Sequence, residues 1–149
     1  MDKLRFSRVR KVIPPIRAHS LDAGIDFFVP SDFSITKVAP GNSIKIPSGV
    51  KANIPQGYAL IAFNKSGVCT TLDIIAGACV IDSGYQGEIH IHLINVSSRD
   101  VFITPDMKIM QFILMPVSNV KTEECDIKEL YEQESERSTG GFGSTGWAA

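Results

Sequence analysis

The stretch GACVIDSGYQGEIHIHLIN (residues 77–95) joins an apolar run, a cluster of turn residues and an alternating segment. The apolar run at 78–81 is followed by Asp82-Ser83-Gly84, a sequence that favours a turn. From Ile89 onward, apolar residues alternate with two histidines, which is the period of a half-buried strand. The stretch therefore predicts a β-hairpin whose tip presents an acid, Asp82, and a ring, Tyr85, to a small planar ligand. On these residues alone, an ordinary hairpin with Asp82 in an Asx-turn is the alternative.

The rest of the chain reads as short strands separated by Pro, Gly, Asn and Asp clusters. Strands are expected at 27–29, 33–38, 43–46, 50–54, 58–63, 101–104 and 109–117. Such spacing is typical of an all-β sandwich or barrel. Residues 126–136 are rich in Glu and Lys and are the one segment predicted to be helical. The basic N-terminal segment, residues 3–11, is interrupted by apolar residues, so an edge strand is expected there rather than a nucleic-acid-binding arm.

Length and composition limit the class of protein. A chain of 149 residues is long enough for one domain with a hydrophobic core and too short for two ordinary domains. The hydrophobic content of 44%, the charged content of 21% and the net charge of -1 are those of a soluble globular protein with no general attraction to nucleic acid or anionic membrane. There is no apolar run near the roughly 20 residues of a membrane helix. Three cysteines without metal-binding spacing predict a reduced, cytoplasmic protein.

The C-terminal segment 138–146 is Gly, Ser and Thr around a single Phe142, with Arg137 just before it. Its composition is typical of a mobile linker. However, glycine N–H groups can wrap a phosphate, Arg can clamp an anion and Phe can stack on a base. The segment alone does not decide between these interpretations.

Five motifs, taken together and in order, resemble those of the homotrimeric deoxyuridine triphosphatases (dUTPases). They are DAGIDF (22–27), NKSG (64–67), VID with YQG (80–82 and 85–87), KIMQ (108–111) and Arg137 with GGFGSTG (140–146). The resemblance covers nearly the whole chain, and the third motif lies in the stretch quoted first.

The resemblance implies an all-β fold, a jelly-roll-like β-barrel of the β-clip type with a flexible Gly-rich C-terminal arm. It implies one domain over 1–149, with the β-barrel core over about 1–125 and the arm over about 126–149. It also implies a homotrimer in which each active site uses all three chains. The implied reaction is hydrolysis of dUTP to dUMP and pyrophosphate with Mg²⁺ on the triphosphate. That reaction limits uracil incorporation into DNA and supplies dUMP for dTMP synthesis. The implied partners are therefore dUTP and other copies of this chain, with no nucleic acid and no membrane.

The resemblance also implies a role for each site residue. Asp82 and Gln111 would hold the attacking water, and Asp26 would contact Mg²⁺ through its water shell. The uracil would bind to the backbone around Cys79, Val80, Ile81 and His90. Tyr85 would exclude a 2′-hydroxyl. Phe142 would stack over the base, and the phosphates would be held by Lys65, Ser66, Gly67, Lys108, Arg137 and Gly143. Both histidines of the alternating segment are expected to be outward strand residues rather than metal ligands.

Two departures and two rival functions stay open. Lys65 and Lys108 stand where the family usually has Arg, and Lys cannot make the bidentate fork of Arg. One rival is a dCTP deaminase or a bifunctional relative, which would need a catalytic Glu near the pyrimidine, with Glu88 as the candidate. The other is a dUTP-sensing trimeric regulator. A cellular and a viral origin are both compatible with the sequence, and a viral protein would be expected in the host cytoplasm.

Overall fold

The computed structural model describes residues 3–141, and Phe142, Gly143 and the rest of the glycine-rich motif lie outside this range. The chain divides into two units, one up to Ser118 and one from Asn119 onward. The first unit holds all the strands of the described chain. The described part of the second unit, 119–141, consists of exposed turns and irregular backbone.

The first unit is built almost entirely from short strands, as the sequence predicts. The elements are β1 (Arg5–Arg8), β2 (Ile25–Phe28), β3 (Thr36–Val38), β4 (Ser43–Pro47), β5 (Val50–Asn53), β6 (Tyr58–Phe63), α1 (Ser66–Leu72), β7 (Ile74–Ala76), β8 (Val80–Asp82), β9 (His90–Asn95), β10 (Val101–Ile103) and β11 (Lys108–Pro116). The all-β class is thereby confirmed.

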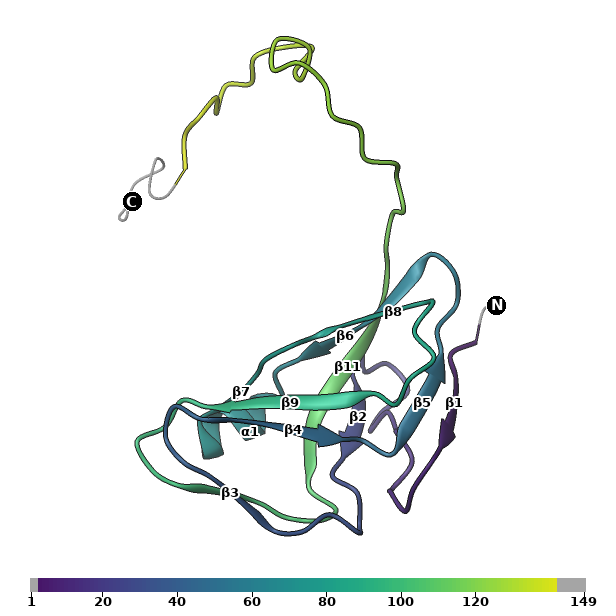
Figure 1. Ribbon diagram of the computed structural model, residues 1–149, viewed down its shortest axis with the longest axis vertical. Helices are drawn as coiled ribbons and strands as arrows, with labels where there is room; N and C mark the ends of the chain where they lie inside the picture. The colour runs from purple at the N-terminus through teal and green to yellow at the C-terminus, as the bar shows by residue number, and fades with distance from the viewer. Residues whose placement is uncertain (1–2, 142–149) are drawn as a thin grey trace. The chain divides into compact units, whose positions relative to one another are not determined.

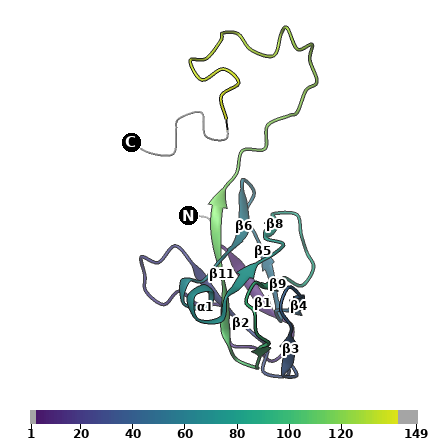
Figure 2. The ribbon, with the colours of Figure 1, turned by 90° about the vertical axis from the view of Figure 1, so that its left-hand side faces the viewer.

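Two antiparallel sheets enclose the core. One has the order β2-β11-β6-β8 and the other has the order β4-β9-β7. In Figures 1 and 2, β9 and β4 run side by side and cross the direction of β11. Two-stranded ribbons, β1-β5 and β3-β10, complete the unit.

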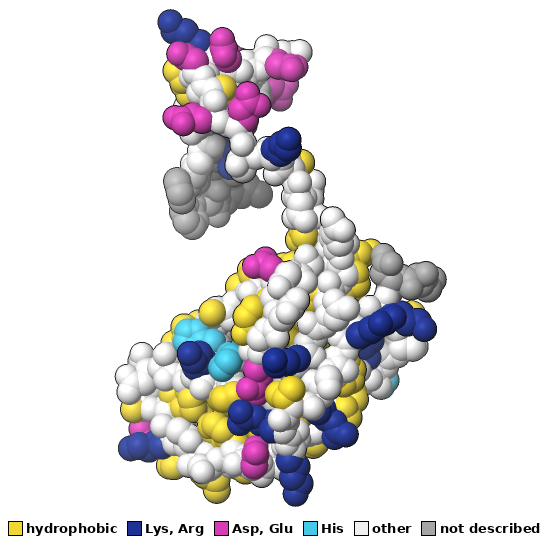
Figure 3. Space-filling model, turned by 45° about the vertical axis from the view of Figure 1, so that its right-hand side comes forward, with side chains coloured by type: hydrophobic (Ala, Val, Ile, Leu, Met, Phe, Trp, Pro, Cys, Tyr) yellow, Lys and Arg dark blue, Asp and Glu magenta, His cyan; other side chains and the backbone are white. Residues whose placement is uncertain are grey.

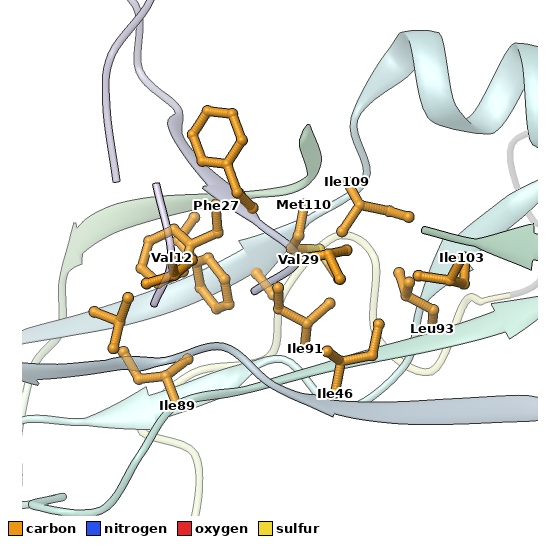
Figure 4. Close-up of a cluster of buried hydrophobic side chains, with 14 of the residues drawn as sticks. Val12, Phe27, Val29, Ile46, Ile89, Ile91, Leu93, Ile103, Ile109 and Met110 are labelled. Carbon is orange, nitrogen blue, oxygen red and sulfur yellow. The ribbon is translucent and has the colours of Figure 1, made fainter. Parts of the chain in front are cut away.

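The core lies between these two sheets. In Figure 4, Ile46 and Ile91 from the three-stranded sheet point toward Val29 and Met110 from the β2 and β11 side. All four side chains are fully buried. The alternation predicted for the histidine-containing segment is confirmed, because Ile91, Leu93 and Asn95 are buried whereas the histidines are not.

The predicted hairpin over residues 77–95 is wrong in its pairing. β8 pairs with β6, whereas β9 pairs with β4 and β7, so the two strands of the expected hairpin belong to different sheets. The connection 83–89 therefore bridges two sheets. This arrangement leaves the facing edges of β8 and β9 open toward each other.

The helix predicted at 126–136 is also wrong. That segment contains isolated turns, one of them closed by a bond from the Glu129 N–H to the Asp126 carbonyl at 2.9 Å. It is exposed throughout, and an isolated helix of this length that buries no apolar face is marginal in water. The observed helix is α1, which the sequence did not predict, and it is followed by the equally unpredicted β7.

Within the described residues, no helix is long and apolar enough to cross a membrane. On the face shown in Figure 3, the surface of the strand-containing unit mixes basic, acidic and apolar side chains. This face therefore does not present a field of one sign.

Candidate functional site

A cavity of about 190 Å³ lies between the open edges of β8 and β9. It is lined by Ala78, Cys79, Val80, Ile81, Asp82, Tyr85, Ile89 and His90. The predicted uracil-binding residues and Asp82 therefore come together around one cavity. Asp82 lies at the end of β8 and is exposed.

Backbone polar groups face this cavity because antiparallel strands direct alternate residues to opposite edges. The Ala62 N–H donates to the Cys79 carbonyl at 2.8 Å, so the N–H and carbonyl of the next residue, Val80, point away from β6. On β9, the Ser48 N–H donates to the Ile89 carbonyl at 2.9 Å, so the backbone groups of His90 point away from β4. Donors and acceptors from two strands thus converge across an opening of nucleobase size.

Tyr85 is held in place over the connection between the two strands. Its N–H closes a turn onto the Asp82 carbonyl at 3.1 Å, and its hydroxyl donates to the Glu88 carbonyl at 2.9 Å. A Cβ at Gly87 would overlap the phenol ring, so glycine is required there for the ring to lie close to the backbone. Tyr85 as a whole is 44% exposed, and it borders the cavity.

Glu88 is directed elsewhere. One of its carboxylate oxygens accepts from the Gly49 N–H at 2.7 Å, and the Arg10 guanidinium binds the carboxylate at 3.1 Å. Its side chain does not line the cavity between β8 and β9. The carboxylate that the deaminase alternative requires is thus already used to tie the N-terminal segment to the loop.

The two histidines on β9 act as parts of the strand framework. The Ala78 N–H donates to Nδ1 of His92 at 2.8 Å, and a Cβ at Gly77 would overlap the same ring. Nδ1 of His90 bonds the Glu88 carbonyl at 2.9 Å. No group of three or more His, Cys, Asp or Glu residues that could hold a metal ion occurs in the part of the chain that the structure describes.

A second cavity, of about 290 Å³, gathers the first, second and fourth motifs. It is lined by Ala18, Asp22, Ala23, Gly24, Asp26, Lys65, Gln111 and Ile113. Gln111 lies directly across from Asp26 in the β11–β2 register, and its side-chain amide donates to the Asn64 carbonyl at 2.7 Å. A Cβ at Gly24 would overlap the Gln111 side chain, so the glycine makes room for it.

An irregularity in β11 brings the Lys108 side chain to Asp26, which lines this cavity. The register with β2 shifts between Lys108 and Met110, so one extra residue is accommodated there, and Ile109 and Met110 are both buried. This bulge turns Lys108 to the outer face that Gln111 occupies. Its ammonium then lies 3.1 Å from Asp26 Oδ2 and 5.8 Å from the centre of the Phe28 ring.

Asp26 is the most buried charged group of the site, at 5% exposure. Lys65 Nζ lies 2.9 Å from its Oδ1, and Lys108 Nζ lies 3.1 Å from its Oδ2. Burial by itself would raise the pKa of this carboxyl, but the two lysines outweigh burial and hold the pKa below its usual value. Each carboxylate oxygen already has a cationic partner, so these residues do not form a resident Mg²⁺ site.

The two cavities are far apart in one chain. Asp82 lies opposite Ala59 of β6, and Gln111 lies opposite Phe63 on the other side of the same strand. Four residues along β6 and two inter-strand spacings separate their backbones by roughly 16 Å. Their side chains therefore cannot hold one water molecule within a single chain.

The remaining predicted residues are placed as follows. Ser66 and Gly67 are exposed in the first turn of α1, next to Lys65. Arg137 lies in the second unit, where its Nε donates to the Gly140 carbonyl at 2.8 Å. Phe142 and Gly143 lie outside the described residues.

Sequence reasoning assigned no role to two residues that shape the second cavity, although one of them, Asn64, begins the second motif. Arg17 donates from Nη1 to the carbonyls of Asp22 and Ala23, the latter at 2.6 Å, and so holds the loop before Asp26. The side-chain Oδ1 of Asn64 accepts a hydrogen bond from the Ala76 N–H at 2.7 Å, and its backbone carbonyl accepts one from the Gln111 side-chain amide. The Asn64 contacts leave no signal in the local sequence, because they join Asn64 to residues that are distant along the chain. The Arg17 contacts span only five and six residues, but they depend on how the loop between Arg17 and Ala23 is folded.

Comparison with known proteins identifies the class. The dUTPase family model matches residues 10–146. The deoxyuridine 5′-triphosphate nucleotidohydrolase of Gloeobacter violaceus is 33% identical over 135 residues, which cover 89% of this chain and 88% of that protein.

Solved structures share the fold. A mutant dUTPase of Staphylococcus bacteriophage 80alpha with dUpNHpp superposes with a TM-score of 0.85 at 23% identity, over 99% of this chain and 100% of that one. A mutant dUTPase from phage phi11 of S. aureus, described as revealing the details for the coordination of a structural Mg(II) ion, superposes with a TM-score of 0.78 at 20% identity, over 89% of this chain and 100% of that one. The chain belongs to the dUTPase family.

Proposed function

We propose that this chain hydrolyses dUTP to dUMP and pyrophosphate, as a homotrimer of jelly-roll-like subunits acting on the Mg²⁺ complex of the nucleotide. The observation that carries this proposal is the open edge between β8 and β9, where backbone groups, an acid and a ring surround a cavity of nucleobase size. Membership of the dUTPase family supports it. Such an activity would limit uracil incorporation into DNA and supply dUMP for dTMP synthesis.

Recognition of uracil would come from the backbone of β8 and β9. Uracil presents a donor at N3 and an acceptor at O4, which the N–H and carbonyl groups of Val80 and His90 can match. Cytosine presents the opposite pattern, so it would leave buried polar groups without partners, at a cost of about 1–3 kcal/mol for each group. Tyr85, fixed by its bond to the Glu88 carbonyl, would pack on the deoxyribose and leave no space for a 2′-hydroxyl.

The chemistry would be displacement at the α-phosphorus. Asp82 would orient a water molecule and accept its proton, while Gln111 holds the same water from another chain. The water oxygen bonds to phosphorus as the bond to the bridging oxygen breaks, and pyrophosphate leaves with that oxygen. Lys65, Lys108 and Arg137 would offset the phosphate charge, with Ser66 and Gly67 donating hydrogen bonds. Phosphoryl transfer depends mainly on such positioning and charge neutralisation.

Mg²⁺ would arrive with the triphosphate, on which it neutralises charge between phosphate groups. Asp26, the buried acid of this cavity, is already paired with two lysines, and Asp22 accepts the His19 N–H at 2.9 Å, so we expect the ion to be held by the substrate rather than by these acids.

The separation of the two cavities supports an active site that is shared between chains of the proposed trimer. Each chain carries a base-binding half with Asp82 and a phosphate-binding half with Gln111, about 16 Å apart. A complete site requires the base-binding half of one chain against the phosphate-binding half of a neighbour. Arg137 and Phe142 would come from the C-terminal arm of a third chain.

The test is incubation with dUTP and Mg²⁺ and identification of the products. We expect equimolar dUMP and pyrophosphate, with no ammonia from dCTP, since the Glu88 carboxylate is engaged by Arg10 and Gly49. Release of ammonia from dCTP would favour the deaminase, and absence of any turnover with tight dUTP binding would favour a sensor.

A further inference from the structure

Asp26 has both carboxylate oxygens occupied, each by a different lysine. Lys65 Nζ lies 2.9 Å from Oδ1, and Lys108 Nζ lies 3.1 Å from Oδ2. The backbone of Asp26 is held as well, because its N–H donates to the Ile16 carbonyl at 2.7 Å and its carbonyl accepts from the Ile16 N–H at 3.2 Å. The carboxylate is thus a fixed point onto which two flexible side chains converge.

The charge of this group favours an anion. Two ammonium groups and one carboxylate give this group of three a net charge of +1. Asp22, which also lines the second cavity, is bound through Oδ2 by the His19 N–H at 2.9 Å rather than by either lysine. A divalent cation approaching Asp26 would meet an ammonium at each oxygen. A phosphate approaching the lysines would instead find two cations held close together by one acid.

Because both cations are lysines rather than arginines, they need a fixed acid such as Asp26 to hold their ammonium groups in place. An Arg guanidinium is planar and presents its donors in a preformed fork, whereas a Lys ammonium sits on a flexible four-carbon stem and loses more freedom when it is fixed. Lys65 precedes α1 in an extended conformation, and the bulge at Ile109 turns Lys108 outward. Their ammonium groups therefore approach from separate elements and meet only at Asp26.

We propose that Asp26 is a positioning residue, which holds Lys65 and Lys108 ready for the substrate phosphates and does not bind the metal ion. The inference rests on the proposed dUTP hydrolysis and assigns Asp26 a different task from that implied by the family resemblance. When the triphosphate binds, each ammonium exchanges one carboxylate oxygen for a phosphate oxygen while Asp26 limits how far it can move.

The first experiment measures whether Asp26 is coupled to the metal. The affinity for dUpNHpp is determined with Mg²⁺ and with EDTA, in the parent and in Asp26→Asn. A positioning role predicts that the ratio of the two affinities is the same in both proteins, within about twofold. A metal ligand predicts that the ratio falls by about 10–100-fold in the variant, as is typical when metal coordination is disturbed. That fall would overturn the proposal.

The second experiment measures whether Asp26 acts through the lysines. Asp26→Asn should lower kcat about 10–100-fold, because the phosphates are then misplaced by ångström distances. In a Lys65→Gln, Lys108→Gln background the same substitution should change kcat less than about twofold, since nothing is left to position. Full additivity, or no effect of Asp26→Asn in the parent, would equally overturn the proposal.

A third measurement needs no variant at Asp26, in case that protein does not fold. Mn²⁺ is titrated into the ligand-free parent, and the side-chain amide of Gln111, which lies opposite Asp26 in the sheet, is followed by NMR. The proposal predicts no selective broadening, and strong broadening at low Mn²⁺ would refute it. If dUpNHpp fails to bind the parent at all, the proposed dUTP hydrolysis fails. That outcome is distinct from a change in the ratio of the affinities with Mg²⁺ and with EDTA, which would overturn only the role of Asp26.

Discussion

Two inactive variants of this chain should restore each other's activity when they are combined in the proposed trimer. The first is Asp82→Asn, which removes the acid of the base-binding half. The second is Gln111→Ala, which removes the amide of the phosphate-binding half. Because the two positions are about 16 Å apart in one chain, a site must take one half from each of two chains.

The expected recovery follows from counting intact pairs of halves. In a random mixture of equal amounts, half of the chains supply an intact Asp82 and the other half an intact Gln111, so about a quarter of the sites are complete. In purified mixed trimers, where both variants are present, one of the three sites is complete, so about a third of parental turnover is expected. If both residues acted within one chain, no site would be complete in either preparation.

The assay uses two affinity tags, one on each variant, and co-expression followed by purification on both tags. Pyrophosphate release from dUTP is then compared with that of the parent and of each variant alone. The matched control pairs Lys108→Ala with Gln111→Ala, which alter the same half, so no recovery is expected. Mixed Asp82→Asn and Gln111→Ala trimers that are no more active than either variant alone would refute the assembly of the site from two chains.

Four further outcomes test individual groups. Asp82→Asn should bind dUpNHpp as the parent does, while kcat falls by about 10²–10⁴. Tyr85→Ala should raise kcat/KM for UTP relative to dUTP, and continued exclusion of UTP would place the discrimination elsewhere. Gly24→Ala should lower kcat without changing uracil specificity, because its Cβ would displace the Gln111 side chain, and normal turnover would show that this packing is unimportant. A chain ending at Glu136 should keep its fold and weak dUMP binding but lose most turnover, and full activity would show that residues 137–149 act only as a linker.

The strands could be predicted because alternation and turn residues are local signals. The helix α1 could not, since its sequence SGVCTTL contains one Gly and several β-branched residues, which are weak helix formers. Asp73 ends it in a left-handed conformation, with φ of 51°. Conversely, 126–136 has the composition of a helix but buries no apolar face, so propensity alone failed there.

The strand pairing of residues 77–95 shows a different limit of prediction from sequence. Alternation correctly assigned Ile91 and Leu93 to the core face, because faces are set by local sequence. Partners are not set locally, and β8 joined β6 rather than β9. The result matters for function, since a closed hairpin would have used the backbone groups of Val80 and His90 that now face the cavity.

The role of Asp26 depends on a single inserted residue in β11. Side chains alternate along a strand, so without the bulge Lys108 would share the face of Met110 and Phe112, both of which are buried. It would then be an unpaired cation in the core, and Asp26 would keep only Lys65. The bulge moves Lys108 to the face of Gln111, where its Nζ lies 3.1 Å from Oδ2 of Asp26 on the neighbouring strand. The sequence shows two adjacent apolar residues, Ile109-Met110, between two polar ones, which is compatible with a bulge but equally with a strand end. Only the pairing with β2 shows that the lysine meets the acid, and it is this meeting that turns an expected metal ligand into an anchor for two cations.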